Sequence, residues 1–123
     1  MKLSQINYDY ETPKEFKVVN PKNKDEFGFI SLYSTESEPF INAQIQLHRD
    51  TIETIKNKGK SPTKKEVEKV LIKSLIAGYN GWEDEDGKEL EFNDENTELL
   101  LNNQFIIKFI NKATADMGNF LGK

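Results

Sequence analysis

The chain has 123 residues, of which 36% are apolar and 31% charged, with no cysteine, one histidine and a net charge of −4. A chain of this length normally forms one domain with a core that needs no covalent support, and the lack of cysteine excludes disulfides, thiolate metal sites and cysteine nucleophiles. The negative charge argues against general nucleic-acid binding, which requires a basic face, and at a mean hydropathy of −0.71 no stretch approaches the roughly 20 apolar residues of a membrane span.

The first predicted elements form a β-hairpin. Residues 1–14 carry little periodicity, so we expect a flexible N-terminal arm ahead of a single globular domain over residues 15–123. Alternating side chains predict strands over residues 15–20 and 27–33, and the segment between them is rich in turn-forming residues. A lone hairpin is only marginally stable in water, so we expect it to pack against helices.

A first helix is predicted from Ser37 and Pro39, a capping residue and a proline suited to the first turn, to about Asn57, with Gly59 as the stop. Its apolar positions recur at helical spacing. The residues of this row are Ile41, Ile45, His48, Ile52 and Ile55, and Leu47 lies beside it. This spacing predicts a core-facing stripe, with His48 as a core or boundary residue rather than a metal ligand.

A second helix is predicted to begin at Thr63, because Thr63 and Glu66 have the spacing of a capping box. We expect it to continue to Gly78. Apolar residues cover much of its circumference, which predicts that it is the central helix of the core.

An acidic segment precedes two further helices. Residues 82–92 contain Asp86-Gly87, a turn signal that predicts a short acidic hairpin turn, and Asn93 or Asp94 is positioned to cap a third helix. A fourth helix is expected after Asn103, ending at Gly118. The predicted fold class is therefore α+β: a helix-dominated single domain of about four helices with a small N-terminal β-hairpin.

The sequence offers little for catalysis. When the acidic turn is aligned with a calcium-binding loop so that Gly87 takes the glycine position, Trp82 and Asn93 fall where the end ligands belong. The acidic residues lie in polar stretches that would not raise a carboxyl pKa, and no base is in view for a hydroxyl nucleophile. We therefore expect no catalytic residues, no metal and no cofactor. Residues 1–10 lack the apolar segment of a signal peptide, so we expect a cytoplasmic protein.

Apolar and charged surfaces remain as candidate interaction sites. The candidates for partner binding are Trp82, Phe92, Phe105, Ile106, Phe109, Phe120 and Leu121. In the fourth helix the alternatives are a helix buried between two layers and an exposed apolar strip. Residues 56–73 hold seven lysines and two acids, whereas residues 82–98 hold nine acids and one lysine. These segments are either solvated faces or complementary surfaces for head-to-tail self-association. The candidates for self-association are Lys64, Lys65, Lys69, Asp84, Glu85 and Asp86.

The second half of the chain resembles a known family. Gly81-Trp82 follows a helix, an acidic turn spans residues 84–88, Phe92 precedes a helix cap, and the chain closes on Asn119-Phe120. This order resembles the tail assembly chaperones of long-tailed (siphovirus-type) bacteriophages and prophages. In the first half, the Asn20-Pro21 turn and the serine-capped helix agree loosely with the same family.

The resemblance implies a non-enzymatic assembly factor. Such a protein binds and solubilises the tape-measure protein in the cytoplasm of the bacterial host while the tail tube protein polymerises around it, and it is absent from the mature virion. Its partners would be the tape-measure protein, possibly the tail tube protein, and further copies of itself.

Two other functions stay open. A small phage or prophage protein could bind and inhibit a host protein, with the acidic segment imitating nucleic acid in a basic cleft. A structural subunit of the tail or of the head–tail junction would instead be present in purified particles.

Overall fold

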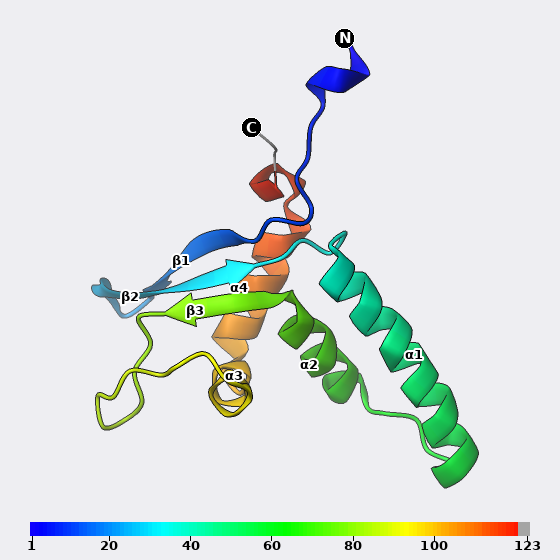
Figure 1. Ribbon diagram of the computed structural model, residues 1–123. Helices are drawn as coiled ribbons and strands as arrows, with labels where there is room; N and C mark the ends of the chain where they lie inside the picture. Colours follow the sequence, from blue (N-terminus) through cyan, green and yellow to red (C-terminus); the bar gives the residue numbers. More distant parts are fainter. Residues whose placement is uncertain (121–123) are drawn as a thin grey trace.

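A three-stranded antiparallel sheet in the order β1-β2-β3 organises the protein (Figure 1). The computed structural model describes residues 1–120. β1 (Lys14–Asn20) and β2 (Asn23–Leu32) form the predicted N-terminal hairpin, and β3 (Ile76–Asn80) pairs with the other edge of β2. Together with the four α-helices found within residues 1–120, the sheet confirms the predicted α+β fold class.

The register of the hairpin gives the sheet one buried face. Phe16 pairs with Ile30, and Val18 pairs with Gly28. Because successive side chains in a strand point to opposite faces, Val18, Ile30 and Leu32 enter the core together. The alternation in the sequence therefore corresponds to a buried and an exposed face of the hairpin.

β3 corrects the prediction for the second helix. Helix α2 (Lys64–Leu75) ends before residue 78, and the chain continues as a strand. Two effects favour the strand. Gly78 is a poor helix residue, and β2 offers unpaired backbone groups that residues 76–80 satisfy. Ile76 and Tyr79 are buried in the core from their positions in the strand. The same apolar residues are therefore compatible with a strand as well as with a helix.

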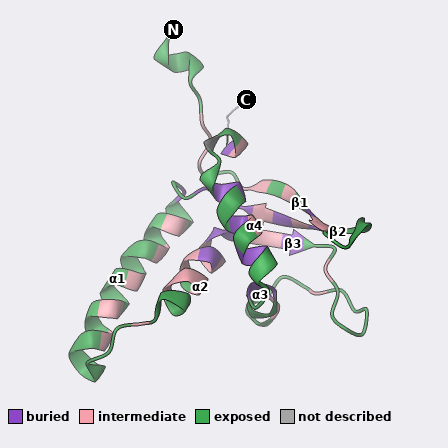
Figure 2. Cartoon of the chain, turned by 180° about the vertical axis from the view of Figure 1, so that it is seen from behind, coloured by how far each residue is buried: buried purple, intermediate pink, exposed green. Residues whose placement is uncertain are grey.

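Helix α1 (Glu38–Lys58) has the predicted ends, but the apolar row that was expected to face the core is exposed to solvent. Ser37 occupies the N-cap and Gly59, at φ 65°, ends the helix. None of the 21 residues of α1 is buried (Figure 2). The isoleucines of the predicted core stripe are 40–47% exposed, and His48 is exposed rather than a core residue. A different face of the helix is half-buried. Its residues are Phe40, Ala43, Leu47, Thr51 and Thr54.

The last two helices complete the core. α3 (Asp94–Leu101) begins at Asn93, whose side chain accepts a hydrogen bond from the Asn96 backbone N–H. α4 (Gln104–Ala115) crosses one face of the sheet and leads to the short 3-10 helix η2 (Met117–Phe120) (Figures 1 and 2). The core is one cluster of buried residues, to which all three strands and helices α2, α3 and α4 contribute side chains. Its members are Val18, Ile30, Leu32, Ile72, Leu75, Ile76, Tyr79, Leu100, Leu101, Ile106, Ile107, Ile110 and Ala113.

The N-terminal arm is tied to the domain at its inner end. The backbone N–H of Asp9 donates to the carbonyl of Phe120 at 2.7 Å, and the Ser34 hydroxyl donates to the carbonyl of Tyr10 at 3.2 Å. Hydrogen bonds from the side chain and backbone of Thr12 lower the pKa of Asp9. Beyond these contacts, the arm extends away from the domain with a 3-10 turn, η1 (Leu3–Gln5) (Figure 1).

Candidate functional site

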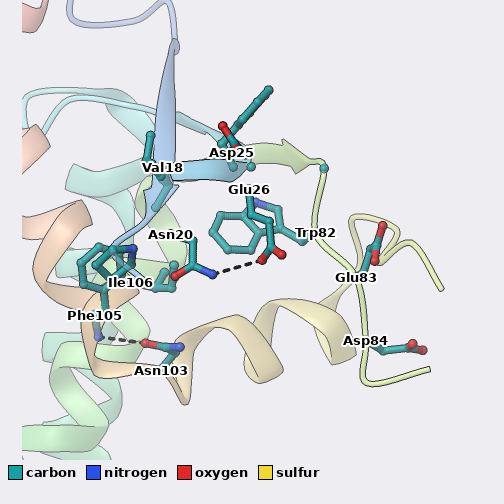
Figure 3. Close-up of a pocket in the computed structure, with 15 residues that line it drawn as sticks. Val18, Asn20, Asp25, Glu26, Trp82, Glu83, Asp84, Asn103, Phe105 and Ile106 are labelled. Carbon is teal, nitrogen blue, oxygen red and sulfur yellow. Dashed lines mark hydrogen bonds between the residues drawn. The ribbon is translucent and has the colours of Figure 1, made fainter. Parts of the chain in front are cut away.

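A cleft of about 840 Å³ lies at one end of the sheet (Figure 3). Three segments that are distant in the sequence form its walls. They are the end of β1 with the first part of β2, the residues that follow β3, and the first turn of α4. This is the size range of sites that bind small ligands or anchor side chains of a protein partner.

Trp82 forms one apolar wall of the cleft and is held by the sheet. Its indole N–H donates to the carbonyl of Phe29 at 3.1 Å, and its ring lies directly over Gly28. A Cβ at Gly28 would come within 2.5 Å of the ring, so only glycine leaves room for it. Gly81, at φ 80°, turns the chain so that Trp82 folds back onto the strand.

The first turn of α4 supplies the opposite apolar wall. The Asn103 side chain caps this helix by accepting a hydrogen bond from the Phe105 backbone N–H at 2.9 Å. Phe105 is 45% exposed, whereas the next residue, Ile106, is buried. This wall of the cleft therefore offers the exposed ring of Phe105 next to the buried side chain of Ile106 (Figure 3).

Four carboxylates line the cleft on the Trp82 side (Figure 3). Asp25 and Glu26 come from the hairpin, and Glu83 and Asp84 follow Trp82. Asn20 holds Glu26 in place by donating from its side-chain amide at 3.1 Å. Among the described residues, no lysine or arginine lines the cleft. The resulting negative potential favours a cationic or amphipathic, basic ligand.

The acidic turn beside the cleft is built as predicted. The Asp84 carboxylate accepts hydrogen bonds from the backbone N–H groups of Asp86 and Lys88, both at 2.9 Å. Gly87 takes φ 79° to close the turn, and Glu83 and Glu89 form an isolated antiparallel bridge. Asp84 thus shapes the turn, while Glu85 and Asp86 are exposed at its tip.

The structure gathers three of the predicted partner-binding residues and separates the others. Trp82, Phe105 and Ile106 meet in the cleft. Phe92 is 53% exposed but lies edge-on against Tyr79, with ring centroids 5.2 Å apart. Phe109 is half-buried and packs against the core, outside the cleft lining.

The C-terminal candidates need correction. Phe120 is 1% exposed, so it packs inside the protein and offers no surface to a partner. Its ring lies 6.4 Å from that of Phe16. Leu121 lies outside the described residues. The fourth helix likewise buries Ile107 together with Ile106 and Ile110.

The charged candidates for self-association lie at two ends of the molecule. The lysine-rich connection from α1 to α2 and the acidic turn are on opposite sides of the domain (Figure 1). Lys64 and Lys65 are exposed, but Lys69 is engaged within the chain. Its ammonium lies 3.4 Å from a carboxylate oxygen of Glu98 and donates to the side-chain oxygen of Asn102 at 3.0 Å. Lys69 therefore helps to join α2 to α3.

The sequence reasoning missed the contribution of the hairpin to the site. Asp25, Glu26 and Gly28 reach the cleft only because β2 runs beside the segment that follows β3. One signal was present: a glycine inside a strand often marks a place where another group approaches the backbone closely. Gly28 is such a position.

No known protein family, curated protein or solved structure matches the chain. Within residues 1–120, no three acidic or histidine side chains are grouped in a way that would hold a metal ion. No helix in this part of the chain combines the length and apolarity needed to cross a bilayer.

Proposed function

We propose that the protein is a non-enzymatic tail assembly chaperone of the long-tailed phage type. In this proposal it binds the tape-measure protein in the cytoplasm of the bacterial host, keeps it soluble during assembly of the tail tube, and is absent from the finished particle. The observation that supports the proposal is the cleft, which Trp82 and Phe105 line together with four carboxylates on the Trp82 side.

The chemistry of the cleft suits one segment of a long helical partner. An apolar side chain between Trp82 and Phe105 would leave water, which stabilises a complex by about 25 cal/mol for each Å² of apolar surface covered. Lysine or arginine side chains beside that anchor would meet Glu26 and Glu83. Each contact can be weak, because many copies on one long partner gain from multivalency.

The rival function is inhibition of a host protein through imitation of nucleic acid. The hairpin favours this reading more than the sequence alone did, because Asp25 and Glu26 extend the acidic surface formed by Glu83 and Asp84. The two functions differ in their response to salt. Mimicry rests on charge and collapses as salt screens it, whereas an apolar anchor in the cleft retains most of its binding.

Co-expression with the large coiled-coil-rich protein encoded beside it tests the chaperone function. We expect the partner to become soluble and to elute with the wild-type protein. Phe105→Asp should abolish both effects, because it places a charge in the cleft where an apolar anchor should bind. Phe92→Asp is the matched control, since Phe92 is similarly exposed but lies outside the cleft.

Three results would contradict the proposal. The partner could stay insoluble with the wild-type protein, both variants could rescue it equally, or the purified complex could dissociate on a modest increase in salt. The last result would favour the host-directed inhibitor, and Glu83→Gln should then weaken binding more than Phe105→Asp does.

A further inference from the structure

The exposed isoleucine face of α1 is an apolar surface that the cleft does not explain. Ile41, Ile45, Ile52 and Ile55 are 40–47% exposed, and His48 lies at the centre of their row. The spacings along this row are four, three, four and three residues. That alternation is the heptad pattern of a coiled-coil seam.

A different face of α1 makes the contact with α2 within the same chain. Phe40, Ala43 and Leu47 are half-buried on the side that packs on α2. At 3.6 residues per turn, this side lies about 120° around the helix from the isoleucine row. The isoleucine row, hereafter the α1 seam (Ile41, Ile45, His48, Ile52 and Ile55), is therefore separate from the α1–α2 contact and faces outward (Figure 2).

We infer that the α1 seam pairs with the α1 seam of a second copy, running antiparallel, to form a homodimer. The row reads Ile-Ile-His-Ile-Ile from either end, so it is complementary to itself when one helix is reversed. The isoleucines at the N-terminal end of one α1 seam then pack against those at the C-terminal end of the α1 seam of the second copy. Both His48 side chains lie near the two-fold axis.

The charges at the ends of α1 favour the antiparallel orientation. Glu36 and Glu38 stand at its N-terminal end, whereas Lys56 and Lys58 stand at its C-terminal end. Within residues 1–120, the ion pairs of the structure join α2 to α3 and leave these four side chains out. An antiparallel pair brings acidic ends against basic ends, whereas a parallel pair brings like charges together. Helix dipoles add to the same preference.

His48 has a role in this dimer that an isoleucine would not have. A single polar residue in an otherwise apolar seam sets register and orientation and costs some stability. A two-helix contact of this length belongs with small interfaces, below about 1,200 Å², so the dimer should dissociate on dilution. This inference does not rest on the partner proposed for the cleft. The cleft is lined by residues at the β1–β2 turn and after β3, and this end of the sheet points away from α1 (Figure 1).

Sedimentation over a range of concentrations tests the dimer. The wild-type protein should shift from monomer to dimer as its concentration rises. Ile45→Glu should remain a monomer throughout, and His48→Leu should strengthen the dimer about tenfold or more because it removes the polar residue from the seam. Leu99→Glu is the matched control, since Leu99 is 54% exposed on α3. It should behave as the wild type does.

Cross-linking through introduced cysteines tests the orientation of the two helices. Because the sequence contains no cysteine, each introduced cysteine is the only thiol that can react. A short bismaleimide should join two copies of His48→Cys but not two copies of Ile41→Cys, whose positions lie about 20 Å apart along an antiparallel pair. Equal cross-linking of both variants would overturn the antiparallel arrangement. A wild-type protein that stays monomeric, or a dimer that survives Ile45→Glu but is lost in Lys64→Ala/Lys65→Ala, would overturn the seam itself.

Discussion

Replacing Phe120 with alanine is expected to lower the free energy of unfolding by about 3–5 kcal/mol, the usual cost of emptying a phenylalanine site in a core. Phe120 is 1% exposed, and its backbone carbonyl also accepts the hydrogen bond from Asp9 that anchors the N-terminal arm. The alanine variant keeps that carbonyl, so the loss comes from packing against Phe16 and its neighbours. Urea denaturation followed by circular dichroism measures the change.

Phe105→Ala provides the comparison for this result. Phe105 is 45% exposed, so its removal should cost much less stability while it weakens partner binding. If Phe120→Ala unfolds at the wild-type urea concentration, Phe120 is not the core residue that the structure shows. Phe120 would then again be a candidate for partner binding, as the sequence predicted.

Replacing Gly28 with alanine is expected to drive Trp82 off the sheet. The new Cβ would lie 2.5 Å from the indole ring, so the ring must move and the bond from its N–H to the Phe29 carbonyl must break. Overpacking of this kind typically costs about 1–3 kcal/mol. Because Trp82 is the single tryptophan of the chain, its fluorescence should shift to longer wavelength as water reaches the ring. Binding at the cleft should weaken with it.

Gly78→Ala is a closely matched control for this substitution. Gly78 lies in β3 of the same sheet, and a Cβ there would meet no atom within 4 Å. The tryptophan emission of the Gly78→Ala variant should match that of the wild-type protein. Its free energy of unfolding should be unchanged or slightly higher, because alanine restricts the unfolded chain. An unchanged emission spectrum in Gly28→Ala would mean that Trp82 does not pack on the strand.

Local signals in the sequence located most elements of the fold. The Thr63 hydroxyl accepts the backbone N–H of Glu66 at 3.2 Å, as the capping pattern predicted, and Gly59 ends α1 in a left-handed conformation. Caps, turns and alternation act over a few residues, so the residues themselves carry the information. The third strand was missed for the opposite reason: residues 76–80 are a short apolar run whose state depends on the neighbouring strand.

The candidate site was predictable only in part. Trp82, Phe105 and Ile106 were recognised as apolar residues available for contact, but no local pattern brings the first of these beside the other two. Their meeting, and the addition of Asp25 and Glu26, depends on how β2, β3 and α4 pack. Phe120 shows the same limit, since aromatic residues near a chain end are equally suited to a surface and to a core.

The sequence by itself determined most of the elements, the residues that cap the helices and the existence of apolar stripes, because these follow from side-chain chemistry over a few residues. Only the tertiary structure decided which stripes are covered. α1 carries two apolar faces, and periodicity alone favoured the isoleucine row because it is the more hydrophobic. In the folded protein α2 packs against the other face, and the isoleucines remain exposed. Burial is a property of the whole packing arrangement, and for this reason the outward α1 seam and the acidic cleft emerge only from the fold.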